Sequence, residues 1–467
     1  MTAAPMASEH PARTILTVLA ERVRDRPDKL FLRFRDHDLT YAQFDRRTRS
    51  LAGGLRRHRV ADAGPDPESL RILPSLLPNC ADGIALWFAS NRIDIVWAPL
   101  NTEFRGDGLA HAINLTGCRD LVVDDSLLDP VLEIGDALHH VERLFVRGTS
   151  TPSSSTAGGR SFEVLSLEQL DGAVDAVPPS SPLPGDPSLL IYTSGTTGMS
   201  KACELSHHYV VEQAGMLARS LGLREDDVAF CPYPIFHWDA TLGTIVPALL
   251  SGATAIVTER FSVSSFWEDV RHFGVTIFDF MGATLTWLHQ QEARPNDADN
   301  PARIGWGIPM PAFKADFERR FGLVLVEGYG STEGGVMAFQ APGEPYPIGS
   351  CGRAVPEYQI RIVDEGDSPL DPGGIGEIVV KPAGDRSRYL MMSGYYRMPE
   401  VNAEAFRGGW FHTGDLGRLD TQGNLYFEGR QKDDDQAAGR EHFGLRDREG
   451  DRIASVGAGG RCFRGAE

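Results

Sequence analysis

The stretch Tyr192-Thr193-Ser194-Gly195-Thr196-Thr197-Gly198-Met199-Ser200-Lys201 is the most informative part of this 467-residue chain. It follows an apolar run, and Ser206 stands a few residues later where it can N-cap a helix. The glycines allow close approach of the backbone to a ligand, the hydroxyls can donate to phosphoryl oxygens, and Lys201 adds a positive charge. The pattern predicts a polyphosphate-binding loop. A Ser/Thr/Gly-rich surface turn is the alternative, and a Walker loop is excluded because the Gly-Lys-Ser/Thr ending is absent.

Short β-branched runs recur on both sides of this loop and alternate with helix-period segments. In one such segment Tyr41, Phe44 and Thr48 step by three and four along a single face. The alternation predicts an α/β architecture with mostly parallel sheets. The expected strands include residues 94–97, 120–123, 188–192, 255–257, 275–278 and 323–326.

After about Gly343 the pattern changes. Strand-like runs at 376–380 and 424–427 lie closer together, with turn residues such as Asp371-Pro372-Gly373-Gly374 between them. We therefore expect an antiparallel or barrel-like subdomain after the α/β units. The Ser-, Thr- and Gly-rich segment 149–160 is predicted to be a flexible surface loop.

The composition limits the classes of function. The formal net charge of −18 argues against nucleic acid as the main partner. The six cysteines lie far apart and form no zinc or disulfide pattern, which is typical of reduced thiols in a cytoplasmic protein. No apolar run approaches the roughly 20 residues of a membrane span.

Three further motifs follow the loop. They are Gly328-Tyr329-Gly330-Ser331-Thr332-Glu333, then Gly409-Trp410-Phe411-His412-Thr413-Gly414-Asp415-Leu416-Gly417, then Gly429-Arg430-Gln431-Lys432-Asp433. Together with the loop they resemble, in the same order, the signatures of the adenylate-forming (AMP-binding) superfamily, and within it the acyl-CoA synthetases. The family usually ends its loop in Pro-Lys-Gly, whereas this chain has Ser200-Lys201-Ala202, a change that removes no ligand group.

The resemblance implies a fold and a division of the chain. It implies two Rossmann-like α/β subdomains and a distorted β-barrel subdomain within a large domain at 10–428. It also implies a C-terminal α+β lid domain, which we expect to be missing here, with 429–467 as a hinge remnant and tail of little stable structure. Because the codons of Asp434 onward can be written so that the next reading frame gives a family-like continuation, we hypothesise that the tail is frameshifted.

The resemblance also implies roles for individual residues. Tyr329 would stack on adenine, Asp415 would accept from both ribose hydroxyls, and Glu333 would bind Mg²⁺, as hard cations prefer carboxylate oxygens. Glu333 could instead be a solvated loop acid. The residues expected at the catalytic centre are Thr193, Lys201, Thr332 and Glu333. The residues expected to hold ATP are Thr193, Ser194, Gly195, Thr196, Thr197, Gly198, Lys201, Gly307, Gly328, Tyr329, Gly330, Thr332, Asp415 and Arg430, with Lys432 at the hinge.

Two segments resemble the walls of the acyl pocket. His237 in Pro234–His237 and Gly282 in Phe278–Thr284 would contact the carboxylic acid substrate. His237 could equally be a satisfied core histidine. Gly307, in the turn Gly305–Pro309, could equally belong to a buried turn without a ligand.

The function implied is that of an acid–thiol ligase, an AMP-forming acyl-CoA synthetase. A carboxylic acid would be activated by ATP and Mg²⁺ as an acyl-adenylate and then transferred to coenzyme A. Without the lid we expect this activity to be impaired. The alternative is a non-catalytic protein that binds a nucleotide or an acyl-adenylate.

Overall fold

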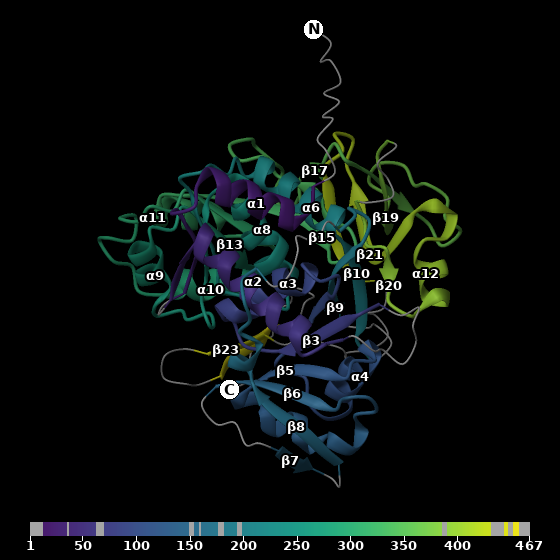
Figure 1. The fold of residues 1–467 in the computed structure, drawn as a ribbon. Helices are drawn as coiled ribbons and strands as arrows, with labels where there is room; N and C mark the ends of the chain where they lie inside the picture. Colours follow the sequence, from purple (N-terminus) through teal and green to yellow (C-terminus); the bar gives the residue numbers. More distant parts are fainter. Residues whose placement is uncertain are drawn as a thin grey trace.

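Two nine-stranded sheets form the body of the protein in the computed structural model (Figure 1). The structure describes residues 13–34, 37–61, 70–148, 154–157, 160–175, 182–193, 199–384, 390–430, 443–446 and 452–456. Both sheets are parallel in the middle and antiparallel at their ends. The α/β expectation is therefore confirmed.

The first sheet carries the strand that leads into the predicted phosphate loop. Its order is β20 (Gly394–Tyr395), β10 (Lys201–Ser206), β9 (Pro187–Thr193), β4 (Val96–Pro99), β3 (Ile72–Leu76), β5 (Asp120–Asp124), β6 (Arg143–Arg147), β8 (Arg160–Ser166) and β7 (Ser154–Ala157). Its blue strands β5, β6 and β8 occupy the lower part of Figure 1.

The second sheet carries the Gly328–Glu333 motif. Its order is β17 (Arg353–Ala354), β16 (Gly335–Phe339), β15 (Val324–Ser331), β14 (Ile304–Ile308), β13 (Ile277–Met281), β11 (Val228–Cys231), β12 (Thr254–Val257), β1 (Leu30–Arg33) and β2 (Asp38–Thr40).

The two helices that the sequence predicted, after Thr40 and after Ser206, are present as α2 (Tyr41–Arg57) and α6 (His207–Ser220). The other helices described are α1 (Ile15–Asp25), α3 (Ala81–Asn91), α4 (Gly106–Thr116), α5 (Leu128–Glu133), α7 (Trp238–Ala240), α8 (Val246–Ser251), α9 (Phe266–Phe273), α10 (Gly282–Gln290), α11 (Lys314–Phe321) and α12 (Pro399–Ala405). Short 3₁₀ turns are η1 (Asp125–Leu127), η2 (Gly135–Ala137), η3 (Leu167–Leu170) and η5 (Arg407–Gly409), and a π-helical turn, η4 (Thr241–Ile245), joins α7 to α8.

Three helices connect the two sheets. Helix α3 packs on β4 and β9 of the first sheet and on α2, which contacts β1 and β2 of the second. Helix α6 touches β9 and β10 on one side and β16 on the other. Its start is fixed as predicted, since the Ser206 hydroxyl accepts from the Tyr209 N–H at 3.1 Å. One apolar core therefore joins the phosphate-loop strand to the second motif.

The third subdomain is a four-stranded antiparallel sheet. It has the order β18 (Tyr358–Val363), β19 (Gly376–Pro382), β21 (Phe411–Leu419) and β22 (Leu425–Arg430). This agrees with the expected change to close antiparallel strands. With β18 and β22 at its two ends, the sheet is open rather than a closed barrel within the described residues. In Figure 1, β19 and β21 lie beside β10 and β20 with α12.

The expectation of a loop at 149–160 needs correction. Ser154–Ala157 forms β7, which pairs antiparallel with β8 through Ala157 and Arg160, so part of the predicted 149–160 loop is a hairpin. In the tail, β23 (Phe443–Arg446) and β24 (Arg452–Val456) form an antiparallel pair, and the expectation of little stable structure over 429–467 stays a prediction. In both pairs the two strands are close neighbours in the sequence.

The cysteines and the helices that the structure describes can be compared with the expectations of free thiols and of no membrane span. Five cysteines are free and buried, while Cys462 lies outside the described residues. Among the helices described, none is long and apolar enough to cross a bilayer.

Candidate nucleotide site

The predicted phosphate loop lies between two hydrogen-bonded strands. Thr193 ends β9 and Lys201 begins β10, and these two residues stand opposite each other in the antiparallel register. Ser194, Gly195, Thr196, Thr197 and Gly198 lie outside the described residues. Both ends of the loop are therefore fixed by the sheet, which places the Lys201 side chain at the loop's base.

Lys201 is linked to the predicted metal ligand by a tyrosine. The Lys201 Nζ lies 4.0 Å from the centre of the Tyr395 ring, a cation–π contact. The Tyr395 hydroxyl donates to Glu333 Oε1 at 2.8 Å. Burial, followed by the Glu333 charge, raises the pKa of Tyr395, so this hydroxyl keeps its proton and acts as the donor. Two motifs far apart in the sequence are thus held together by one side chain.

Helix α6 anchors the turn that carries Thr332 and Glu333. The Tyr209 hydroxyl donates to the Thr332 carbonyl at 2.8 Å, and the Gln213 side-chain amide donates to the Gly334 carbonyl at 3.0 Å. The Met392 N–H donates to the Glu333 carbonyl at 2.8 Å. Three carbonyls of the turn are satisfied in this way, which fixes the backbone that carries the Thr332 and Glu333 side chains.

Asp415 lies between Tyr329 of the second sheet and Arg430 of the neighbouring strand β22 in its own sheet. The Tyr329 hydroxyl donates to Asp415 Oδ2 at 2.7 Å, and the Arg430 Nε lies 3.3 Å from Oδ1. Burial raises the pKa of Asp415 to about 6, against the opposing effects of Arg430 and of the Tyr329 hydroxyl. Burial also raises the pKa of Tyr329 well above its usual range. The carboxylate is desolvated and held by two donors.

Several of the predicted glycines are required by packing. A side chain at Gly307 would place its Cβ 1.8 Å from the Phe280 carbonyl oxygen, and one at Gly330 would place it 2.2 Å from the Gly335 carbonyl oxygen. At Gly328 a Cβ would lie 2.9 Å from the Phe339 ring. These positions bring backbones close together, and that need explains the glycines whether or not a ligand is bound.

The two predicted substrate residues lie at the starts of helices. His237 precedes α7, and its Nδ1 is 3.8 Å from Asp239 Oδ2. Gly282 is the first residue of α10, and a Cβ there would lie 2.6 Å from the Pro309 carbonyl oxygen. The π-helical turn between α7 and α8 follows His237, and such turns are frequent at functional sites. The contact of His237 and Gly282 with a substrate stays a prediction.

Structure adds residues that the motifs did not single out. Tyr395, Tyr209 and Gln213 hold the site together from β20 and α6. The sequence gives little indication of these roles. Tyr395 belongs to a Gly-Tyr-Tyr run that matches none of the motifs, and Tyr209 and Gln213 belong to an amphipathic helix without a motif. Lys432, the predicted hinge, lies outside the described residues.

The donor set suits a magnesium nucleotide. Lys201 and Arg430 offer positive charge, Glu333 offers a hard oxygen ligand, and Asp415 offers acceptors for hydroxyl groups. The residues come from all three sheets. Glu333 is close enough to Asp415 for its charge to raise the pKa of the Asp415 carboxyl. The fold and this grouping are typical of one class of protein, a nucleotide-binding enzyme built on two α/β sheets.

The comparison with family models gives the family itself. Residues 19–396 match the model described as "AMP-binding enzyme". The chain therefore belongs to the AMP-binding enzyme family, and the expectation drawn from the four motifs is confirmed.

Relatives of this chain include proteins named as acyl-CoA synthetases or ligases. A steroid-22-oyl-CoA synthetase of Rhodococcus jostii is 38% identical over 259 residues, covering 52% of this chain and 45% of that protein. A medium/long-chain-fatty-acid–CoA ligase, FadD17, of Mycobacterium marinum is 30% identical over 431 residues, covering 92% of this chain and 77% of that protein. The match thus spans less than half of the first relative and about three quarters of the second.

A solved structure shares the fold. The anthranilate CoA ligase AuaEII, in complex with anthranoyl-AMP, superposes with a TM-score of 0.80 at 21% identity, covering 92% of this chain and 80% of that chain. The arrangement of two α/β sheets followed by antiparallel strands is that of known CoA ligases.

Proposed function

We propose that this chain is the adenylate-forming body of an AMP-forming acyl-CoA synthetase. Its family and the names of its relatives support the reaction class. The observation that carries the assignment to this site is the convergence of Lys201, Glu333 and Asp415, with Tyr395 joining the first two.

In the proposed adenylation step, a carboxylate oxygen of the acid attacks the α-phosphorus of ATP. The bond from that phosphorus to the bridging oxygen breaks, and pyrophosphate leaves with the electron pair. Lys201 and the Thr332 hydroxyl would hold phosphate oxygens, while Asp415 and Arg430 would hold the ribose. Bound Mg²⁺ would neutralise phosphate charge, with Glu333 as its ligand. Positioning and charge neutralisation would supply most of the rate enhancement.

In the proposed second step, the thiol of coenzyme A attacks the carbonyl carbon of the acyl-adenylate. The carbon–oxygen bond to AMP breaks, AMP leaves with the electron pair, and the thiol proton passes to water as the thioester forms. The relatives named for steroid-22-oyl and fatty acyl substrates support an apolar carboxylic acid as the substrate class. His237 and Gly282 are the residues of this chain proposed to border it.

Pyrophosphate release tests the proposal directly. The purified chain is incubated with Mg·ATP and a panel of fatty, steroid side-chain and aromatic acids, and thioester formation is followed in parallel after addition of coenzyme A. Release that depends on one class of acid supports adenylation. ATP binding without release for any acid would instead support the non-catalytic alternative. Glu333→Gln is the matched variant, expected to lose release while keeping the fold.

A further inference from the structure

The strand that carries Asp415 is interrupted beside that residue. In the pairing of β19 with β21, Val379 lies opposite His412. The pairing is then interrupted, and it resumes where Glu377 lies opposite Leu416. Residues 413–415 of β21 therefore stand opposite Ile378 alone. Gly414 has φ of 70°, in the left-handed region that favours glycine. This bulge takes Asp415 out of the ladder with β19, while Asp415 stays opposite Arg430 in the ladder with β22. Bulges commonly redirect a side chain beside an active site.

Side chains replace the ladder hydrogen bonds lost in the bulge. The Thr413 hydroxyl donates to the Ile378 carbonyl at 2.7 Å and accepts from the Asp415 N–H at 3.1 Å. The Gly414 N–H donates to Glu377 Oε1 at 3.0 Å. The N–H groups of Gly414 and Asp415 thus both have side-chain partners, which favours this conformation of the 413–415 backbone.

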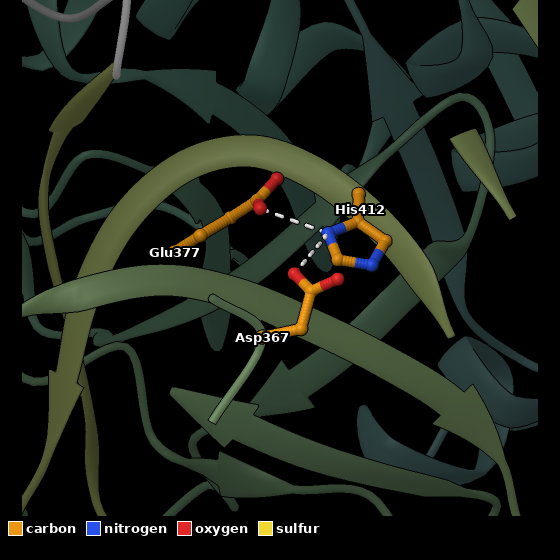
Figure 2. Close-up of side chains that lie close together, drawn as sticks. All are labelled: Asp367, Glu377 and His412. Carbon is orange, nitrogen blue, oxygen red and sulfur yellow. Dashed lines mark hydrogen bonds and ion pairs between the residues drawn. The ribbon is translucent and has the colours of Figure 1, made fainter. Parts of the chain in front are cut away.

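Glu377 is itself held by His412, as Figure 2 shows, and also by Arg407. His412 Nδ1 lies 2.8 Å from Glu377 Oε2 and 3.9 Å from Asp367 Oδ1. Because a carboxylate can only accept, the proton in the shorter contact is assigned to Nδ1. Arg407 donates to both carboxylates, at 3.3 Å to Glu377 and 3.1 Å to Asp367. Glu377 is 8% exposed, so this pairing compensates a nearly buried charge.

Asp367, Glu377 and His412 also have the residue types of a metal site. Two features favour a hydrogen-bonded network instead. The facing atoms of His412 and Glu377 are already at hydrogen-bond distance, and the Arg407 guanidinium supplies the positive charge that a cation would bring.

We propose that Glu377 is a positioning residue for the nucleotide site. Supported by His412 and Arg407, it fixes the 413–415 bulge so that Asp415 faces Tyr329 and Arg430. This inference rests on the proposed function, in which Asp415 accepts from the ribose hydroxyls. Loss of Glu377 would release the bulge and weaken recognition of the ribose, while leaving the phosphate contacts of Lys201 in place.

Binding of ATP and of 2′,3′-dideoxy-ATP, both with Mg²⁺, tests this by titration calorimetry on the full chain. The second nucleotide lacks both hydroxyls and reports the other contacts alone. Glu377→Ala is expected to weaken ATP binding about tenfold, as for loss of one charge-assisted hydrogen bond, while dideoxy-ATP binding changes less than about twofold. Glu377→Gln, which keeps an acceptor for the Gly414 N–H, is expected to recover part of the preference for ATP.

The control is Glu404→Ala. Glu404 also binds Arg407, at 2.8 Å, but it is exposed and does not touch the bulge, so the preference for ATP should be unchanged. If Glu377→Ala does not fold, Thr413→Val removes the hydroxyl from the same bulge with little change in shape and should reduce the preference in the same way.

Other outcomes would overturn the proposal. Equal weakening of both nucleotides would show a general structural role, and an unchanged preference would show that the bulge does not depend on Glu377. A tightly bound Zn²⁺ lost on substitution of Glu377 would favour a metal site. A wild-type chain that binds both nucleotides equally would overturn the role of Asp415 too, which separates failure of the proposed function from failure of this inference alone.

Discussion

The first nine-stranded sheet and the four-stranded sheet place their polar side chains differently. In β3 and β5 every residue is buried, and polar groups such as Ser75 pair within the core. In β21 buried and half-buried residues are mixed, and Asp415 points towards residues of another sheet. The parallel sheet supplies a rigid base, and the antiparallel sheet presents charged groups to a ligand. Substitutions in the two regions should therefore affect different properties.

The largest effect is expected for Trp97→Ala in the first sheet. Trp97 is fully buried, stacks on Trp87 at 5.8 Å and donates from Nε1 to the Ser75 hydroxyl at 2.9 Å. Because the variant loses a large buried ring and leaves a cavity, its free energy of unfolding should fall by about 4 kcal/mol. Urea denaturation measures this change.

The matched control for that experiment is Trp410→Ala beside the four-stranded sheet. Trp410 is half-buried under the Arg361 guanidinium, 4.4 Å from the ring centre, so its loss should cost about 1 kcal/mol. Equal losses for the two tryptophans would contradict the contrast between the regions.

The next effect concerns Glu327, where the second sheet approaches the antiparallel strands. Burial raises the pKa of Glu327 to about 7, although its Oε1 accepts from the Met310 N–H at 3.0 Å. A folded-state pKa above the unfolded value of 4.5 means that stability is greatest below pH 4.5 and is lost as pH rises through 7. At pH 8 the ionised carboxylate should cost about 3 kcal/mol.

Thermal or urea unfolding of Glu327→Gln at pH 5 and pH 8 measures this cost. The variant should be more stable than the wild type at pH 8 and nearly equal to it at pH 5. The exposed Glu344→Gln serves as the control and should match the wild type at both values. A gain for Glu327→Gln that does not vary with pH would show that ionisation is not its cause.

Asp415 should affect binding rather than folding. Asp415→Asn replaces one acceptor oxygen by a donor, so ATP affinity should fall by about 2 kcal/mol, or roughly 30-fold. Glu428→Gln is the control, since Glu428 lies on β22 but pairs with Arg418. A similar loss in both variants would contradict a specific role for Asp415.

The same residue gives a pH test. The pKa of Asp415 is about 6, in surroundings that include Tyr329, Arg430, Glu333 and Glu377. Below that value the carboxyl is protonated and accepts hydrogen bonds less well, so ATP affinity should fall between pH 8 and pH 5. Asp415→Asn should lack this component, and comparing the two proteins removes the titration of ATP itself.

The smallest effect is expected for Tyr395→Phe. The variant keeps the ring beside Lys201 but loses the hydrogen bond to Glu333, which should weaken Mg·ATP binding by about 1 kcal/mol. Tyr395→Leu removes the ring as well and should lose more. Titrating ATP affinity against Mg²⁺ measures both, and a loss that is independent of Mg²⁺ would argue against an action through Glu333.

Much of the fold could be predicted from local patterns. The period of α2, the Ser206 cap of α6 and the strands β5, β9 and β12 follow from hydrophobic spacing and from one capping hydroxyl. The edge strands of the sheets could not be predicted in this way. The sequence of Ser154–Ala157 is typical of a polar loop, and this segment is a strand because it pairs with β8.

The sequence by itself determined the family and the residue types of the site, because glycines, hydroxyls and charges stand in a fixed order along the chain. Only the tertiary structure decided which of these residues meet. Tyr395 joins Lys201 to Glu333, and Glu377 supports the bulge of Asp415, through contacts between residues far apart in sequence. Such contacts depend on sheet register and strand bulges, which are fixed by packing of whole elements rather than by any local pattern.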